Sequence, residues 1–238
     1  ASLKHLNIES MGLTQIDVTN NTLLEFFRVG NNELTSLDIS SSVNLILLYV
    51  YNNSLTELDL SQNLMLSAFS AGNTGISNYD LSNNLQLTEI YLQNNGVTSI
   101  DLTLYPELAY LDLHGNELIS LDLSNNPLLH YVNLHNNQLT TLDLSDRPNL
   151  QFLHCHSNSL EMLNLKHGSD QFEQFNATAN PNLNCIEVLD VAYHEERFTY
   201  ENNSLDEGVV FNEECGPVAL VDPESLSEIL YDHESVVR

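Results

Sequence analysis

The amino-acid sequence predicts a single β-rich solenoid, in which the chain winds through a series of short coils of equal length. Three observations favour this fold. Only about four residues separate the motif "LDLS" from the next leading leucine, too few for a helix. Short stretches within each period alternate apolar and polar residues, which is typical of strands. Apolar residues recur at steps of 21 residues, as in the series Leu3, Leu24, Leu45, Leu66, Leu87, Leu108, Leu129 and Leu150.

Each coil is expected to contribute one strand to a parallel sheet on the concave side. Leu111 and Leu113 flank Asp112, so the leucines point inward and the aspartate points outward. The convex side is expected to be extended chain, with room for a second narrow sheet and no regular helices. Eight copies hold the register, and a ninth follows a one-residue insertion at Lys166, which places the solenoid in residues 1–185. The core forms only between stacked coils, because one coil cannot bury its leucines alone.

A row of asparagines marks the point where the chain turns inward after each strand. An amide side chain both donates and accepts hydrogen bonds, so it can pair the backbone groups buried there. Met11 and Thr74 interrupt the row, the second with Asn73 beside it. The asparagines expected to have this structural role are Asn32, Asn53, Asn95, Asn116, Asn137, Asn158 and Asn180.

A row of aspartates follows the same period further along each coil. Like charges at the strand spacing of about 4.8 Å repel by about 0.9 kcal/mol even in water. We expect each carboxylate to accept N–H groups in a turn that includes the Ser or Thr two residues later. Calcium bound between coils is the alternative, but calcium sites usually draw on several ligand types. The row consists of Asp17, Asp38, Asp59, Asp80, Asp101, Asp122 and Asp143.

The pattern LxxLxLxxNxL resembles the leucine-rich repeat family over residues 1–185. The added "LDLS" and the 21-residue period resemble a class found in secreted and surface proteins of Bacteroidetes-like bacteria. This resemblance implies a secreted or cell-surface location. It also implies a C-terminal cap, because "NPNLNCIEVLDVAY" and the later "FNEEC" resemble the cap that such bacterial repeats carry.

The two ends of the solenoid are expected to differ. The resemblance implies a cap at 186–215 in which Cys185 pairs with Cys215, and Cys155 is expected to be a buried free thiol. The tail at 216–238 is expected to form a short helix at about 223–233 or to begin a linker. The first coil has no lid, so either a domain has been trimmed away before it or another chain meets this edge in an oligomer.

Composition limits the partners. The chain carries 33 acidic and 6 basic residues, a net charge of −27, which repels nucleic acid and anionic lipid. Membrane insertion is not expected, because no apolar run is long enough to cross a bilayer. The solvent-facing positions of the concave side carry charge only at Glu9, Arg28, Glu89 and Asp112. An acidic protein with one nearly neutral, aromatic and amide-rich face is expected to bind a partner there.

We expect this partner to be a protein. A glycan is the alternative, because stacked Tyr and Phe with Asn and His would also suit sugar rings, and a purely structural spacer is a third interpretation. Tyr and Phe offer a large contact area at low entropic cost, and His and Asn add adaptable hydrogen bonds. The concave residues expected to bind are Tyr49, Tyr51, Tyr91, Gln93, Tyr110, Asp112, His114, Tyr131, Asn133, His135, Phe152, His154 and His156.

Three of these histidines, His114, His135 and His156, stand on adjacent coils. Imidazoles about 5 Å apart can share zinc, but ligands in one flat column point in parallel, whereas a metal needs them to converge. Repeat duplication is the preferred explanation, and a ligand-binding or pH-sensitive patch is the other. We therefore expect no cofactor, with zinc and calcium kept as alternatives.

The concave face is not expected to be an active site. Asp112 with His114, or Tyr131 with His135, would be the acid–base pair of an enzyme. No activated Ser or Cys nucleophile stands on that face, however, and a flat sheet excludes water poorly.

Overall fold

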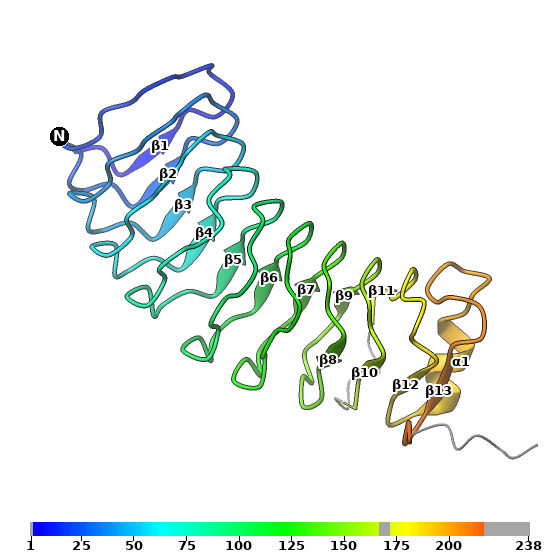
Figure 1. Cartoon of the computed structure of the whole chain (residues 1–238). Coiled ribbons are helices and arrows are strands. Elements are labelled where there is room, and N and C mark those ends of the chain that lie inside the picture. The colour runs from blue at the N-terminus through cyan, green and yellow to red at the C-terminus, as the bar shows by residue number, and fades with distance from the viewer. Residues whose placement is uncertain (1, 167–171, 217–238) are drawn as a thin grey trace, which may run out of the picture.

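The structure, a computed structural model, describes residues 2–166 and 172–216. Over these residues the chain forms a curved solenoid of stacked coils that ends at a cap containing the helix α1 (Val191–Arg197) (Figure 1). The predicted β-rich solenoid with a parallel concave sheet is therefore confirmed.

A nine-stranded parallel sheet lines the concave side. Neighbouring strands pair at the 21-residue step, as Leu6 with Phe27 and Leu111 with Val132. The inserted residue changes the step only at the end, where Phe175 pairs with Leu153. In sheet order the strands are β1 (His5–Asn7), β2 (Phe26–Arg28), β3 (Leu47–Tyr49), β4 (Ala68–Ser70), β5 (Glu89–Tyr91), β6 (Tyr110–Asp112), β7 (Tyr131–Asn133), β9 (Phe152–His154) and β11 (Gln174–Asn176).

The second sheet, for which the sequence leaves room, forms only at the C-terminal end of the described chain. Its parallel strands are, in order, β13 (Val210–Asn212), β12 (Cys185–Glu187), β10 (Met162–Asn164) and β8 (Thr141–Asp143). In the earlier coils the convex side is extended chain without a ladder.

The leucine series forms the core between the coils. Leu24, Leu66 and Leu108 are completely buried, and Cys155 is a buried free thiol in the same core. Burying one such side chain contributes roughly 1.5–3 kcal/mol, so each added coil strengthens the stack.

Paired asparagines have two different roles in each turn after a concave strand. The first of the pair adopts the left-handed backbone conformation, as at Asn52 (φ 52°) and Asn94 (φ 56°), which asparagine tolerates better than most residues. The second is buried, as at Asn53 and Asn95. The first asparagine therefore makes the turn, and the second pairs the backbone beneath it.

The buried asparagines link consecutive coils through their side-chain amides. Asn116 donates to the carbonyl oxygens of Leu92 (3.0 Å) and Leu113 (2.8 Å). Its Oδ1 accepts from the backbone N–H groups of Asn95 and Val97, both at 3.0 Å. One amide therefore satisfies groups on two coils, as expected for buried polar atoms.

The coil with threonine in place of this asparagine is completed by a tyrosine. The Thr74 hydroxyl donates to the Ala71 carbonyl at 3.0 Å, and the Tyr79 hydroxyl donates to the same oxygen at 3.2 Å. Asn73, which stands beside Thr74 in the sequence, is exposed and adopts the left-handed turn. Tyr79, from the adjacent apolar row, therefore gives this carbonyl a second donor.

A second buried polar row, which the sequence analysis missed, lies in the turns that follow the aspartates. Asn126 is fully buried and donates to the Leu102 carbonyl at 3.0 Å. One coil earlier, the Tyr105 hydroxyl reaches the corresponding carbonyl of Leu81 at 2.6 Å. One coil later, the Arg147 guanidinium donates to the Leu123 carbonyl. Three different side chains thus make the same link between coils.

The C-terminal cap covers the last coil. The Asp206 carboxylate accepts from the N–H groups of Ala179 and Asn180, both at 2.9 Å. Asp190 caps helix α1 by accepting from Tyr193 N at 2.9 Å. The predicted disulfide between Cys185 and Cys215 is confirmed. The helix expected at 223–233 lies outside the described residues.

The N-terminal end of the sheet differs from the capped end. Strand β1 is the terminal strand of the sheet and pairs with β2, while Leu6 and Ile8 of its coil are only partly buried. Within the described chain, the only helix is seven residues long, and none is long and apolar enough to cross a membrane.

Candidate binding surface

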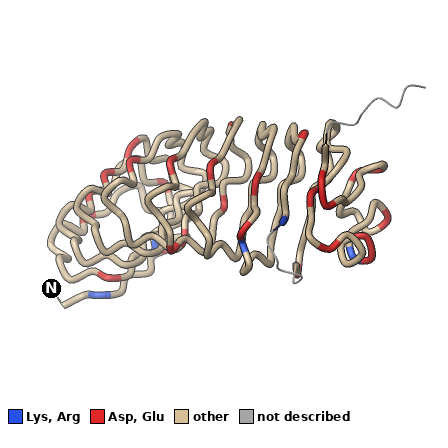
Figure 2. The backbone as a smooth tube through the Cα atoms, turned by 90° about the horizontal axis from the view of Figure 1, so that it is seen from below, with Lys and Arg blue, Asp and Glu red and all other residues tan. Residues whose placement is uncertain are grey.

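The candidate binding surface consists of the outward-facing residues of the nine-stranded sheet and the turn residues directly after its strands. Figure 2 shows Asp and Glu along the whole solenoid and over the cap, with few Lys and Arg. The predicted binding residues form two neighbouring groups on this surface. Four of them surround a hollow near β4, and the others lie over β6, β7 and β9.

The first group encloses a hollow of about 270 Å³. It lies above β4 and the turn after it, where the concave residues Ala68, Ser70 and Gly72 are all small and buried. The coils on either side carry large residues at the matching positions. The hollow is lined by Tyr49, Tyr51, Ser70, Tyr91 and Gln93.

Hydrogen bonds to carboxylates orient two of these tyrosines. The Tyr51 hydroxyl donates to Glu9 Oε1 at 2.9 Å, and the Tyr91 hydroxyl donates to Glu89 Oε2 at 3.3 Å. Burial and then the neighbouring carboxylates raise the pKa of both tyrosines. Both hydroxyls therefore keep their protons at neutral pH and donate them to the carboxylates.

Glycines give two of the lining side chains their positions. A methyl group at Gly30 would overlap the Tyr51 ring, and one at Gly72 would overlap the Gln93 side chain. Tyr51 and Gln93 therefore each lie over the preceding coil, in space that only glycine leaves open.

The second group contains a stacked column of three imidazoles. The rings of His114 and His135 lie 4.3 Å apart and 9° from parallel, and those of His135 and His156 lie 4.4 Å apart and 8° from parallel. His154 meets His156 edge-on at 6.3 Å. Burial, followed by the charges of His114 and His156, lowers the pKa of His135 to about 4.

The Nδ1 atoms of the three stacked imidazoles differ in their hydrogen bonding. His114 Nδ1 lies 2.7 Å from Asp112 Oδ1, and His135 Nδ1 lies 2.6 Å from Asn133 Oδ1. His156 Nδ1 is buried without a hydrogen-bond partner, and burial followed by His154 and His114 lowers its pKa. Because the rings stack face to face, their nitrogens lie side by side and do not point at one centre. No group of three or more metal-ligating side chains within the described residues is arranged to hold an ion.

Aromatic rings beside this column form one continuous patch. His130 lies between Tyr110 and Phe152, with ring centroids 5.6 Å and 5.7 Å away, and Tyr131 lies 6.0 Å from Phe152. His130 was not among the predicted binding residues, because it stands one residue before the strand. Its place directly before Tyr131 in the repeat was the signal available in the sequence.

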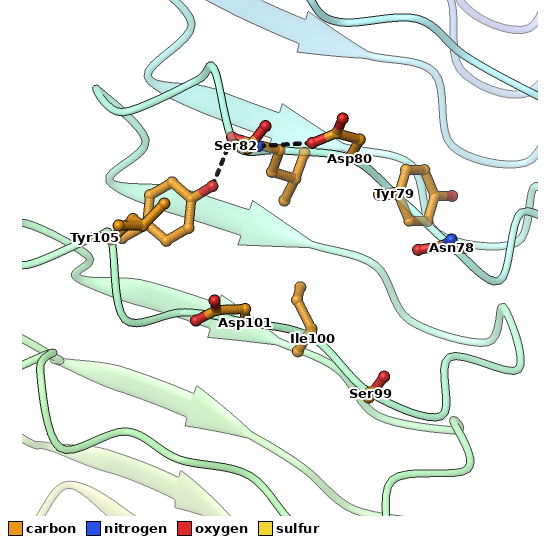
Figure 3. A pocket seen from close by; sticks show the side chains of 10 residues that line it. Asn78, Tyr79, Asp80, Ser82, Ser99, Ile100, Asp101 and Tyr105 are labelled. Atoms are coloured by element: carbon orange, nitrogen blue, oxygen red, sulfur yellow. Dashed lines mark hydrogen bonds between the residues drawn. The ribbon is translucent and has the colours of Figure 1, made fainter.

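A second hollow, of about 450 Å³, lies between two coils near the aspartate row (Figure 3). Asp80 accepts from Ser82 N at 3.0 Å, and Asp101 accepts from Thr103 N at 2.9 Å. Hydrogen bonds from these Ser and Thr side chains lower the pKa of both carboxyls. The same contact recurs at the other aspartates of the row, which confirms the predicted turns.

Taken together, the parallel sheet, the buried asparagine row and a convex side without helices along the described coils define a solenoid of the leucine-rich-repeat fold. No protein-family model matches the chain, and no curated protein matches it. Among solved structures, it is similar to the functional domain of InlJ from Listeria monocytogenes, which includes a cysteine ladder. The identity is 29%, the TM-score is 0.69, and the match covers 78% of this chain and 45% of that one.

Two further structures show the same fold. A leucine-rich-repeat protein of Leptospira interrogans is 21% identical with a TM-score of 0.65, over 79% of this chain and 55% of its own. The plant peptide hormone receptor RGFR1, in complex with RGF2, is 22% identical with a TM-score of 0.54, over 72% of this chain and 33% of its own. The chain thus spans about half the length of the two bacterial proteins.

Proposed function

We propose that the chain is a non-catalytic module that binds another protein on its concave surface. The observation that carries this proposal is the distribution of charge and rings. The chain has a net charge of −27, yet the surface over β6, β7 and β9 is a continuous patch of aromatic, imidazole and amide side chains. Such patches combine a large contact area with adaptable hydrogen bonds.

The solved structures support a peptide or protein as the partner. The receptor RGFR1, whose structure contains RGF2, uses the same fold. The concave surface also favours binding over catalysis. Besides each other, the side chains of Asp112 and His114 contact the amide side chains of Asn133 and Asn94. Among the described residues, no Ser or Cys side chain is hydrogen-bonded to this pair as a nucleophile would be. We propose that the module works without a cofactor.

We also propose that the chain acts outside the cytoplasm, as a secreted or cell-surface protein. The Cys185–Cys215 disulfide supports this location, because disulfides persist mainly in oxidising compartments. The resemblance of the repeat to exported bacterial proteins points the same way.

Two matched triple variants test the proposed surface. The first replaces Tyr110, Tyr131 and Phe152 with alanine. The second replaces three exposed leucines outside the concave sheet, Leu64, Leu85 and Leu128. Partners captured from cell-surface and culture extracts are purified, and their affinities for both variants and the native chain are measured. The concave variant should bind at least tenfold more weakly, as expected for the loss of interface aromatics, and the leucine variant should bind normally.

The outcome of the same experiment identifies the class of partner. Equal affinities for the two triple variants would place binding elsewhere and refute the proposal. Binding that survives protease digestion of the partner, but not removal of its polysaccharide, would assign a glycan in place of a protein.

A further inference from the structure

The hollow above β4 lies between two coils that carry tyrosines on the concave surface. It exists because Ser70 and Gly72 are small, while Tyr49 and Tyr91 on the neighbouring coils form its walls. Its volume of about 270 Å³ lies just below the range of sites for drug-sized ligands. It therefore has room for one large side chain.

The chemistry of the hollow calls for a ligand rich in N–H donors. Tyr51 and Tyr91 already give their hydroxyl protons to Glu9 and Glu89, so their oxygens and ring faces remain as acceptors. Gln93 Oε1 is buried without a hydrogen-bond partner, which is costly unless a ligand supplies a donor.

Charge adds a second requirement. Glu9 and Glu89 place two negative charges beside the hollow, and the nearby cation is Arg28. The Arg28 guanidinium lies 5.2 Å from the Tyr49 ring centroid, so this tyrosine already accepts a cation against its ring. Arg28 is absent from the lining of the hollow, and among the described residues Tyr51 and Tyr91 have no cation against their rings.

We propose that this hollow binds an arginine side chain of the protein partner, an inference that rests on the proposed binding function. A guanidinium is planar and presents five N–H donors. It can therefore stack on a tyrosine ring while it donates to Gln93 and toward the carboxylates of Glu9 and Glu89. A lysine ammonium has three donors and no planar face, and a neutral side chain leaves the two carboxylates with Arg28 as the one nearby cation.

The test titrates the whole chain, with carbon-13 in its tyrosine rings, with N-acetyl-arginine amide and with the neutral N-acetyl-citrulline amide. Tyrosine signals are assigned by Tyr→Phe variants and followed by NMR. The arginine compound should shift the signals of Tyr49, Tyr51 and Tyr91 and leave those of Tyr110 and Tyr131 in place. The citrulline compound should bind about tenfold more weakly, since it lacks the charge.

Two variants make the test specific for the hollow. Ser70→Phe fills it and should abolish the shifts, while Glu89→Gln keeps its shape and should weaken binding several-fold. Equal binding of the arginine and citrulline compounds, equal shifts at Tyr110, or unchanged affinity in Glu89→Gln would each overturn the proposal. The last of these needs no bulky substitution, so it decides the matter even where Ser70→Phe fails to fold.

Partner binding separates this inference from the proposed function. A partner that needs Tyr110, Tyr131 and Phe152 but binds Glu89→Gln and Ser70→Phe normally would uphold the concave surface and refute the arginine site. An arginine-selective hollow in a chain whose concave triple variant still binds its partner normally would uphold the site and refute the proposed surface.

Discussion

Replacing Asn116 with leucine should lower the free energy of unfolding by about 3 kcal/mol. Asn116 is 7% exposed and makes four hydrogen bonds of 2.8–3.0 Å to backbone groups on two coils, besides a longer one of 3.4 Å to the His114 carbonyl. Leucine keeps the volume and removes all four. The two carbonyls are only partly affected, because Leu92 O also accepts from Asn95 and Leu113 O also accepts from Asn137.

The cost comes mainly from the two N–H groups that Asn116 accepts. Asn95 N and Val97 N would be left inside the solenoid without an acceptor, at about 1–3 kcal/mol each. Two such groups cost about 4 kcal/mol, and the better burial of leucine offsets roughly 1 kcal/mol. The net loss is therefore about 3 kcal/mol, a large share of the stability of most domains.

The measurement is urea unfolding at neutral pH, followed by circular dichroism and by tyrosine fluorescence. Both probes must give one transition with an unchanged slope, so that a shifted midpoint reports stability alone. The matched control is Asn83→Leu, an exposed asparagine, which should change stability by less than about 0.5 kcal/mol. An Asn116→Leu chain as stable as this control would refute the role assigned to the amide row.

Three further changes should have measurable effects. Because the pKa of His135 is lowered to about 4 in the folded chain, the unfolded chain binds the proton first, and native stability should fall from pH 6.5 to pH 4. Partial exposure reduces the effect to about 1–2 kcal/mol, and His135→Asn should flatten this part of the stability–pH curve. Replacing Cys185 and Cys215 together with serine should cost about 3–4 kcal/mol, since the bond closes a span of 30 residues, and reducing agent should then no longer lower the melting temperature. Tyr105→Phe should cost only about 1 kcal/mol in urea unfolding, because the Leu81 carbonyl keeps its bond from Asn84 N; a loss above 3 kcal/mol would contradict that bond pattern.

The fold was predictable because leucines recur at steps of 21 residues, which is the pattern of a solenoid with one core position in each coil. The second buried polar row was not predicted, because the residue type changes from one coil to the next. Asn126, Tyr105 and Arg147 make one contact with three different side chains, and a reading by residue type does not group them. Tyr79 was assigned to the apolar row from its position, although its hydroxyl donates to the same Ala71 carbonyl as the Thr74 hydroxyl.

The candidate site was predictable in part. The alternation of inward and outward residues along each strand predicted that these tyrosines and histidines lie on the concave side. The hollow was not predicted, because it arises where large side chains are missing, at Ala68, Ser70 and Gly72. The extent of the convex sheet also could not be predicted, because earlier coils repeat the convex motif "LDLS" of the β8 coil but do not pair there.

The asparagine amides have a consequence for how such a chain changes length. Asn116 reaches one carbonyl on its own coil and one on the coil before it, and Asn137 repeats this arrangement one coil later. Deleting a whole period, such as residues 96–116, would join residue 95 to residue 117. The remaining asparagine amides would then meet backbone carbonyls at the same positions as before. Gene duplication or deletion in units of one turn can thus widen or narrow the inner surface by a single row. A change of one residue instead alters the step between coils, as where Asn180 reaches the Cys155 carbonyl 25 residues back and not 24 as Asn137 does with Leu113.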